Sequence, residues 1–270
     1  MKAAQDSRRT AVDTSPQTAV PSPMLQRLAD ERATGALIRD RGVLYLADGQ
    51  VVHAESPSTP GMDILLTTGG ALRADGWWDA IDRAGAGQHV GRYLVESGRV
   101  PGGALELCHL SALYDAAFFA LAPTRTPARF RYGVSHWLGP LRPVPVDIVQ
   151  RETLRRRELL DRIWPEALTD HAPLAPTAHP VDAPVPPRRR RVLDLVDGAR
   201  TATDIAQELG CSAFHTLVDL RRLAAAGLVE AVRQTSALSA SAPGRVTLPD
   251  VTADPDVALL HRLRDALEAL

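Results

Sequence analysis

The chain has 270 residues, of which 45% are hydrophobic and 23% are charged, and its formal net charge is −1. These values are typical of a globular protein that is long enough for two domains. They exclude a strongly basic or acidic protein, so any surface that binds a nucleic acid has to be local.

The sequence predicts neither a targeting signal nor a membrane segment. The N-terminus lacks the apolar region of a signal peptide, and no stretch of about 18 uncharged apolar residues occurs. Cys108 and Cys211 lie far apart and form no metal-binding or redox motif. We therefore expect a cytoplasmic protein that does not contact a membrane, with both cysteines buried as small apolar residues.

The first ordered region is predicted to be a small antiparallel sheet. Residues 1–23 are polar and contain several prolines, so we expect them to be disordered. Asp48-Gly49 is a residue pair that favours a type I′ hairpin turn, because both central residues of that turn need a positive φ. Strands are predicted on both sides of this turn and before it, over residues 35–38, 43–46 and 50–54.

Helices are predicted for most of residues 62–164. Their spacing of apolar residues and their glycine and proline boundaries are typical of helices. The expected helices cover residues 62–66, a segment with Trp77, Trp78 and Ile81, residues 89–96, residues 101–121 and residues 146–164, with a returning strand over 130–132. Residues 24–164 are therefore predicted to be an α+β domain, in which a small β-meander is covered by helices.

Residues 165–187 are predicted to be a linker between two domains. Seven of these residues are prolines, a composition typical of an extended and semi-stiff segment. We expect this linker to be unpacked.

The C-terminal region is predicted to be a mostly α domain over residues 188–250. Thr201 and Asp204 have the spacing of a capping box, and Ser212 is a suitable N-cap. Helices are predicted over residues 192–196, 202–209 and 213–226, followed by strands over 228–232 and 245–248 that would pair as a wing. Residues 254–270 predict an amphipathic C-terminal helix, which is too short to be stable alone and should dock on this protein or on a partner.

One stretch in the predicted sheet carries a resemblance to a known family. It consists of Thr34-Gly35-Ala36-Leu37, the run GVLYLADGQVVHA over residues 42–54, and Gly61, with the charged run QRETLRRRE over residues 150–158. Residues 24–160 resemble the PATAN family (DUF4388), the N-terminal domain of PatA-type response regulators. The resemblance implies a signalling and protein-interaction domain without catalysis.

A second resemblance covers residues 201–229. The pattern Ile205-Ala206, Leu209-Gly210, Ser212, Leu217, Leu220, Leu223 and Gly227-Leu228-Val229 resembles the winged helix-turn-helix of bacterial transcription regulators. The two resemblances together imply a transcriptional regulator, in which the PATAN-like domain receives a protein signal and the winged helix contacts double-stranded DNA, as a homodimer. The alternative is an adaptor in a small-GTPase or roadblock-type circuit, which binds proteins through the PATAN-like domain or the C-terminal helix and does not bind DNA.

The residues predicted to contact DNA are mostly basic. They are Arg188, Arg189, Arg190, Arg191, Ser212, His215, Arg222 and Arg233. At 100° per residue, one face of helix 213–226 contains Ala213, Leu217, Leu220 and Ala224 and should pack inward, and the opposite face contains His215, Val218, Asp219 and Arg222. Asp219 on that outer face would repel phosphate, which favours the adaptor.

No motif of an enzyme, a metal site or a cofactor site is recognised, so we predict a protein without catalytic activity, metal or cofactor. His53 and Glu55 share one face of a strand, where they would be either an acid/base pair or a polar pair at the strand end. Trp77 and Trp78 would be either a stacking platform or two packing residues.

Overall fold

The structure is a computed structural model, and it describes residues 22–178 and 184–233. The predicted disorder before residue 22, the strand over 245–248 and the C-terminal helix over 254–270 lie outside the described residues. Among the helices of the described ranges, none combines the length and the apolar character needed to cross a bilayer.

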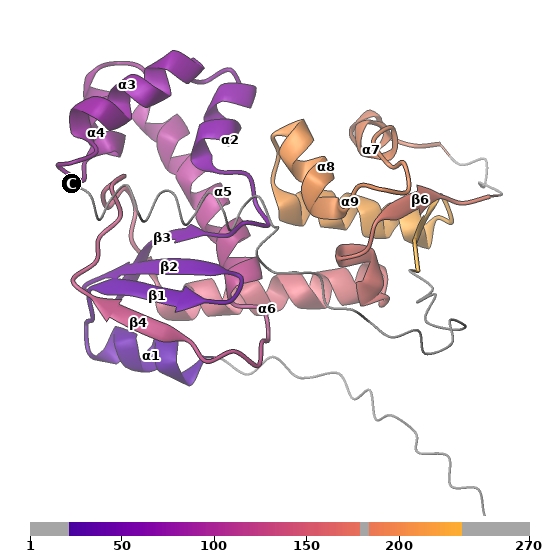
Figure 1. The fold of residues 1–270 in the computed structure, drawn as a ribbon, viewed down its shortest axis with the longest axis horizontal. Helices are drawn as coiled ribbons and strands as arrows, with labels where there is room; N and C mark the ends of the chain where they lie inside the picture. Colours follow the sequence, from indigo (N-terminus) through magenta and orange to yellow (C-terminus); the bar gives the residue numbers. More distant parts are fainter. Residues whose placement is uncertain (1–21, 179–183, 234–270) are drawn as a thin grey trace, which may run out of the picture. The chain divides into compact units, whose positions relative to one another are not determined.

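A five-stranded antiparallel sheet forms the centre of the N-terminal region (Figure 1). Its order is β4 (Arg129–Tyr132), β1 (Gly35–Arg39), β2 (Gly42–Ala47), β3 (Gln50–Glu55) and β5 (Val144–Pro145). The three consecutive strands pair as the predicted meander, with Leu37 opposite Leu44 and Leu44 opposite Ala54. The predicted strands and the α+β class of this region are confirmed.

The hairpin between β2 and β3 has the predicted turn. Asp48 has φ of 50° and Gly49 has φ of 77°, which are the two positive values of a type I′ turn. A Cβ atom at Gly49 would lie 2.5 Å from the carbonyl oxygen of Ala29, so a side chain is excluded for steric reasons as well. The turn is therefore fixed both by its own backbone and by the end of α1.

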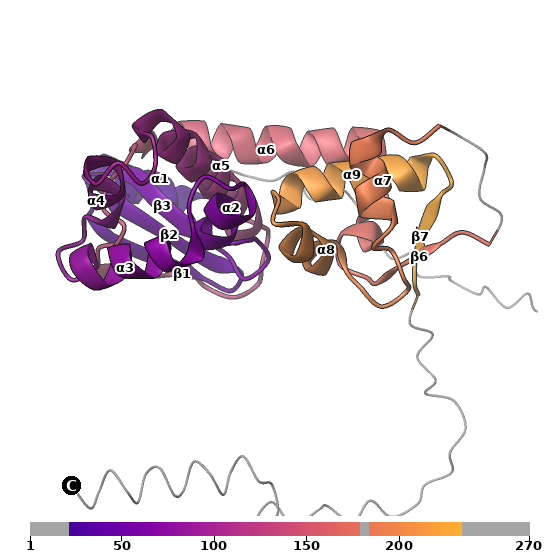
Figure 2. The same ribbon diagram turned by 90° about the horizontal axis from the view of Figure 1, so that it is seen from above.

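Three helices pack on the sheet or along its edge: α1 (Pro23–Asp30), α5 (Gly102–Ala120) and α6 (Val146–Ile163). Their apolar faces meet the strands in one core cluster that includes Leu28, Leu44 and Leu113. The helix α6 continues from this layer to the C-terminal helices, as both Figure 1 and Figure 2 show.

A second helical layer follows β3 in the chain. It consists of α2 (Met62–Thr68), α3 (Ala74–Ala84) and α4 (Val90–Glu96), and it packs against α5 through a separate apolar cluster. This cluster includes Trp77 and the buried Leu138 from the segment between β4 and β5. The segment 136–138 thereby lies beside α3, although about sixty residues separate the two in the sequence.

The prediction of an unpacked linker is wrong for much of residues 165–187. A 3₁₀ helix covers Ala167–Asp170, and β6 (Leu174–Pro176) pairs with β7 (Val229–Ala231) in an antiparallel sheet. Leu174 is fully buried. The prolines of this segment are compatible with pairing because β6 is short and Pro176 lies at its end, where proline is tolerated.

The C-terminal helices are α7 (Pro187–Leu193), α8 (Ala202–Leu209) and α9 (Ala213–Ala225). The capping box of Thr201 and Asp204 is formed, and Ser212 is the N-cap of α9, as predicted. The predicted start of the first helix at Val192 is wrong. Pro187 begins α7, since its fixed φ suits the first helical position, and the arginines that follow are good helix formers.

The core of the C-terminal helices continues into α5 and α6. Phe118, Phe119 and Leu160 belong to the same apolar cluster as Leu217 and Leu220 of α9. The residues up to Val232 accordingly form one compact unit, although the sequence predicted a linker between two separate cores.

We predict that Leu174→Ala lowers the free energy of unfolding by about 2–5 kcal/mol, the usual loss for a fully buried leucine. Urea denaturation followed by circular dichroism measures this loss. Leu107→Ala is the matched control, because Leu107 is 72% exposed and its truncation should change stability by less than about 0.5 kcal/mol. Equal stability of the L174A variant and the wild type would mean that β6 is not part of the folded unit.

Candidate functional site

The predicted DNA-binding residues lie on two helices and at the end of β7. The side chains of Arg188, Arg190 and Arg191 on α7 are exposed, and Arg189 is half-buried. The Nε atom of Arg188 lies 2.9 Å from a carboxylate oxygen of Asp219, so one of these charges is already paired. Arg233 is exposed, two residues after the end of β7.

The helix α9 is buried on most of its surface. From Ala213 to Ala225, only His215, Arg222 and Ala225 are exposed. The predicted inner face is buried, but the predicted outer face is wrong at two positions: Val218 is 7% exposed and Asp219 is 4% exposed. Val218 packs in the shared apolar cluster and Asp219 faces Arg188 of α7, because α9 is covered by neighbours on more than one side.

A buried carboxylate of α5 occupies the N-terminus of α9. The two carboxylate oxygens of Asp115 accept hydrogen bonds from the backbone N–H groups of Ala213, at 2.7 Å, and Phe214, at 2.8 Å. A helix N-terminus is a favourable place for an anion, and in DNA-binding helices it is where phosphate or base contacts are often made. Ser212, which was predicted both to cap this helix and to contact DNA, accepts a hydrogen bond from the N–H of His215.

A buried arginine holds α9 from another side. Arg221 is 2% exposed and forms a bidentate pair with Asp170 of the 3₁₀ helix, with distances of 2.8 and 2.5 Å. It also donates a hydrogen bond to the carbonyl oxygen of Trp164. The sequence analysis missed both Asp115 and Arg221, because each partner lies about fifty or more residues away in the chain.

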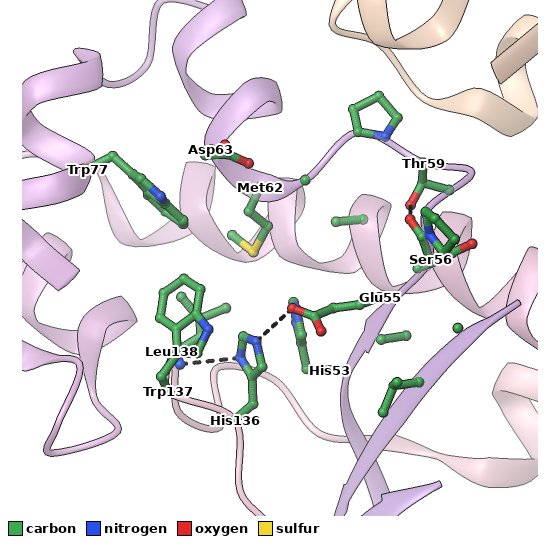
Figure 3. Close-up of a pocket in the computed structure, with 18 of the residues that line it drawn as sticks. His53, Glu55, Ser56, Thr59, Met62, Asp63, Trp77, His136, Trp137 and Leu138 are labelled. Carbon is green, nitrogen blue, oxygen red and sulfur yellow. Dashed lines mark hydrogen bonds and ion pairs between the residues drawn. The ribbon is translucent and has the colours of Figure 1, made fainter. Parts of the chain in front are cut away.

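A pocket of about 710 Å³ lies in the N-terminal region, between β3, α2, α3, α5 and the segment 136–138 (Figure 3). Its walls are mostly apolar, with a few polar side chains that converge on one end. The residues that define it here are His53, Glu55, Asp63, Trp77, Trp78, Ala112, Ala116, His136, Trp137 and Leu138. A concave, mostly apolar site with a few convergent polar groups is the usual form of a small-molecule site.

Glu55 is the centre of the polar end. His136 donates its Nε2–H to one oxygen of Glu55, at 3.0 Å, and the hydroxyl of Tyr45 donates to the other, at 3.3 Å. The hydrogen bond from His136, together with that from Tyr45, holds the pKa of Glu55 below its usual value although partial burial opposes this. Burial raises the pKa of Tyr45 to about 12. Glu55 is therefore an ionised carboxylate and Tyr45 a neutral phenol at neutral pH.

Two further histidines lie behind His136. The ring of His53 stacks on that of His136 at 4.0 Å between centroids, and on that of His109 at 5.5 Å. His109 donates its Nε2–H to the carbonyl oxygen of Val52, at 2.9 Å. Burial lowers the pKa of both His53 and His109, so both rings are neutral at pH 7. Within the described ranges, Nδ1 of His53 is buried and has no hydrogen-bond partner.

His53, Glu55 and His136 also offer ligand atoms within 4.8 Å of one another, a set that could hold a divalent metal and that the sequence analysis did not predict. The surroundings are unfavourable for such an ion. A ligating histidine usually donates its other N–H to an acceptor, but Nδ1 of His136 faces the backbone N–H of Leu138, at 3.3 Å. Nδ1 of His53 has no acceptor either.

Other candidates from the sequence are also placed by the structure. His53 and Glu55 share the pocket, but the 3.9 Å between His53 Nε2 and Glu55 Oε1 is too long for a hydrogen bond. Trp77 is 4% exposed and Trp78 is 62% exposed. Cys108 and Cys211 are half-buried and not fully buried as expected, and burial raises the pKa of Cys108 to about 11.

Comparison with protein-family models, with curated proteins and with solved structures finds no match to this chain. The two family resemblances and the functions that they imply therefore stay predictions.

We predict that Asp115→Ala lowers the free energy of unfolding by about 2–3 kcal/mol, because two backbone N–H groups at the start of α9 lose their acceptor. Thermal and urea denaturation measure the loss. Ser212→Ala, which removes the N-cap hydroxyl of the same helix, should cost about 1 kcal/mol. A loss for D115A no greater than that for S212A would contradict the assigned role of Asp115.

The ionisation of Asp115 predicts a pH dependence. Burial raises the pKa of its carboxyl above 3.8, so the folded state binds the proton more tightly than the unfolded state. The stability of the wild type relative to Asp115→Asn should therefore decrease as the pH rises from 3.8 through the raised pKa. Parallel urea titrations of the two proteins over this pH range give the difference, and a difference that stays constant or increases would show that the pKa is not raised.

Proposed function

We propose that this chain is a non-catalytic signalling adaptor, in which a winged-helix-type module of α7–α9 completes the folded unit and does not read DNA. The burial of α9 is the observation that carries this proposal. Val218 and Asp219 belong to the face that would enter a major groove, and both are covered. The carboxylate of Asp115 lies where a phosphate would approach the start of the helix.

The partner that the sequence resemblance suggests is a protein of a bacterial small-GTPase or roadblock-type circuit. In this proposal the PATAN-like region, or the C-terminal segment over residues 254–270, provides the contact. The proposal assigns the cell interior as the place of action and requires no metal or cofactor.

A DNA-binding regulator is the second candidate, and one observation favours it. Arg188, Arg190, Arg191, His215 and Arg222 are all exposed on the neighbouring helices α7 and α9. The ring of His215 is partly shielded by its neighbours, and this shielding, followed by the charge of Arg188, lowers its pKa. A basic surface of this kind can contact phosphates without placing α9 in a groove.

Fluorescence anisotropy with labelled duplex DNA of random sequence separates the two candidates. The adaptor predicts no saturable binding at about 50 mM salt, and no difference between the wild type and the triple variant R188A/R190A/R191A. The matched control variant is R92A/R142A/R151A, which removes the same charge from exposed positions of the N-terminal region.

A steep loss of binding between about 50 and 200 mM salt, weakened by the α7 variant but not by the control variant, would overturn the adaptor proposal. In a regulator that contacts three phosphates through α7, the triple variant should reduce the slope of log K against log salt by about 0.9 for each lost contact. Equal weakening by both variants would indicate only the total charge of the protein and would not support a DNA site on α7.

A further inference from the structure

The pocket beside β3 gathers aromatic side chains in a chain that has few of them. Aromatic residues make up 4% of the sequence, yet three of its four tryptophans line this one pocket. Trp77 is buried and meets Trp137 edge to face, with 5.7 Å between ring centroids. Trp78 is 62% exposed and lines the pocket at its solvent-facing side. Core packing explains Trp77, but it does not explain an exposed indole at the same place.

The permanently charged side chains that line the pocket are all acidic. Glu55 and Asp63 line it, and none of its lining residues in the described ranges is lysine or arginine. The rings of His53 and His109 are neutral, and Glu55 is ionised. Glu55 is also accessible, since 47% of its side chain is exposed although it receives two hydrogen bonds. An anionic group at one end of an aromatic pocket favours a cation and disfavours an anion.

We propose that this pocket binds a small organic cation, whose ammonium group pairs with Glu55 and whose apolar, aromatic body packs against Trp77, Trp78 and Trp137. Figure 3 shows Glu55, His53, His136, Trp77 and Trp137 arranged around one space. The volume of about 710 Å³ is within the usual range for a small-molecule site. Indole faces attract cations more strongly than other aromatic rings do, so the tryptophans of the pocket add to the attraction that Glu55 exerts on a cation.

A metal ion at His53, Glu55 and His136 is the main rival occupant. It would have to break the hydrogen bond from the N–H of Leu138 to His136, or leave that ring without a proton on either nitrogen. A metal ion also gives no role to the three tryptophans. An organic cation uses both the carboxylate and the indoles, and it leaves the hydrogen bond between His136 and Leu138 intact.

The helix α5 contacts both the pocket and the start of α9. Ala112 and Ala116 of α5 line the pocket, and Asp115 of the same helix turn accepts the N–H groups of α9. A bound cation would thus contact the helix that holds the C-terminal helices in place. This inference goes beyond the proposed adaptor, to which it adds a small-molecule input, and it does not depend on whether α9 binds DNA.

Three aromatic probes of similar size but different charge test the proposal: benzylammonium, benzyl alcohol and benzoate. We expect benzylammonium to bind the full chain at pH 7 with a dissociation constant on the order of 1 mM, which is reasonable for so small a probe. Isothermal titration calorimetry and tryptophan emission measure binding. Benzyl alcohol should bind about tenfold more weakly, and benzoate should bind more weakly still, because Glu55 repels it.

Variants locate the binding. Glu55→Gln should weaken benzylammonium about tenfold, or about 1.4 kcal/mol, and leave benzyl alcohol unchanged. The control Glu106→Gln removes an exposed carboxylate outside the pocket and should change neither probe. Trp78→Ala should weaken both probes, and the exposure of Trp78 means that the fold tolerates this change.

Several results would overturn the proposal. These are absence of saturable binding by benzylammonium, equal binding of benzoate, or equal loss of benzylammonium binding in E55Q and E106Q. Binding of Zn²⁺ that needs His53 and His136, without any binding of benzylammonium, would assign the cluster to a metal instead. Failure of the cation-binding proposal would leave the DNA-binding test unaffected, because that test uses variants of α7 and no variant of a pocket residue.

Discussion

The contact between the Asp115 carboxylate and the start of α9 determines how the described residues up to Val232 form one unit. A carboxylate that leaves water loses several kcal/mol of solvation, so it has to be compensated locally. Here two backbone N–H groups and the positive end of the dipole of α9 provide the compensation. Arg156 of α6 lies 3.9 Å from the same carboxylate and stacks over the ring of Phe214, at 4.5 Å. One buried group thereby fastens α5, α6 and α9 together.

The contact between Asp115 and the start of α9 limits how this helix could bind DNA. A recognition helix has to present its N-terminal turn and one continuous face to the major groove. In α9 the N-terminal turn is occupied by Asp115. The face that would enter the groove is interrupted by the buried Val218 and Asp219. Reading DNA with this face would require the helix to leave α5 and α7, which would expose the apolar cluster around Phe118 and Leu217. The basic residues that remain exposed are suited to less specific contacts.

Asp115 of α5 and Glu55 of β3 have opposite electrostatic surroundings. Asp115 is enclosed and satisfied by the protein itself, whereas Glu55 receives two hydrogen bonds and still faces solvent. An enclosed carboxylate stabilises the fold, and an accessible one with aromatic neighbours is suited to an external cation. Since α5 contributes Ala112, Ala116 and Asp115, occupancy of the pocket and the position of α9 share a physical connection.

The sequence by itself determined the elements whose causes are local. The type I′ turn at Asp48-Gly49, the capping box of Thr201 and the N-cap at Ser212 were all predicted, because each depends on residues within a few positions. Only the tertiary structure decided that His136 meets Glu55 across 81 positions and that Asp115 meets Ala213 across 98. It likewise decided that Asp219 is buried, since a helical pattern specifies which residues share a face but not how many faces are covered by neighbours.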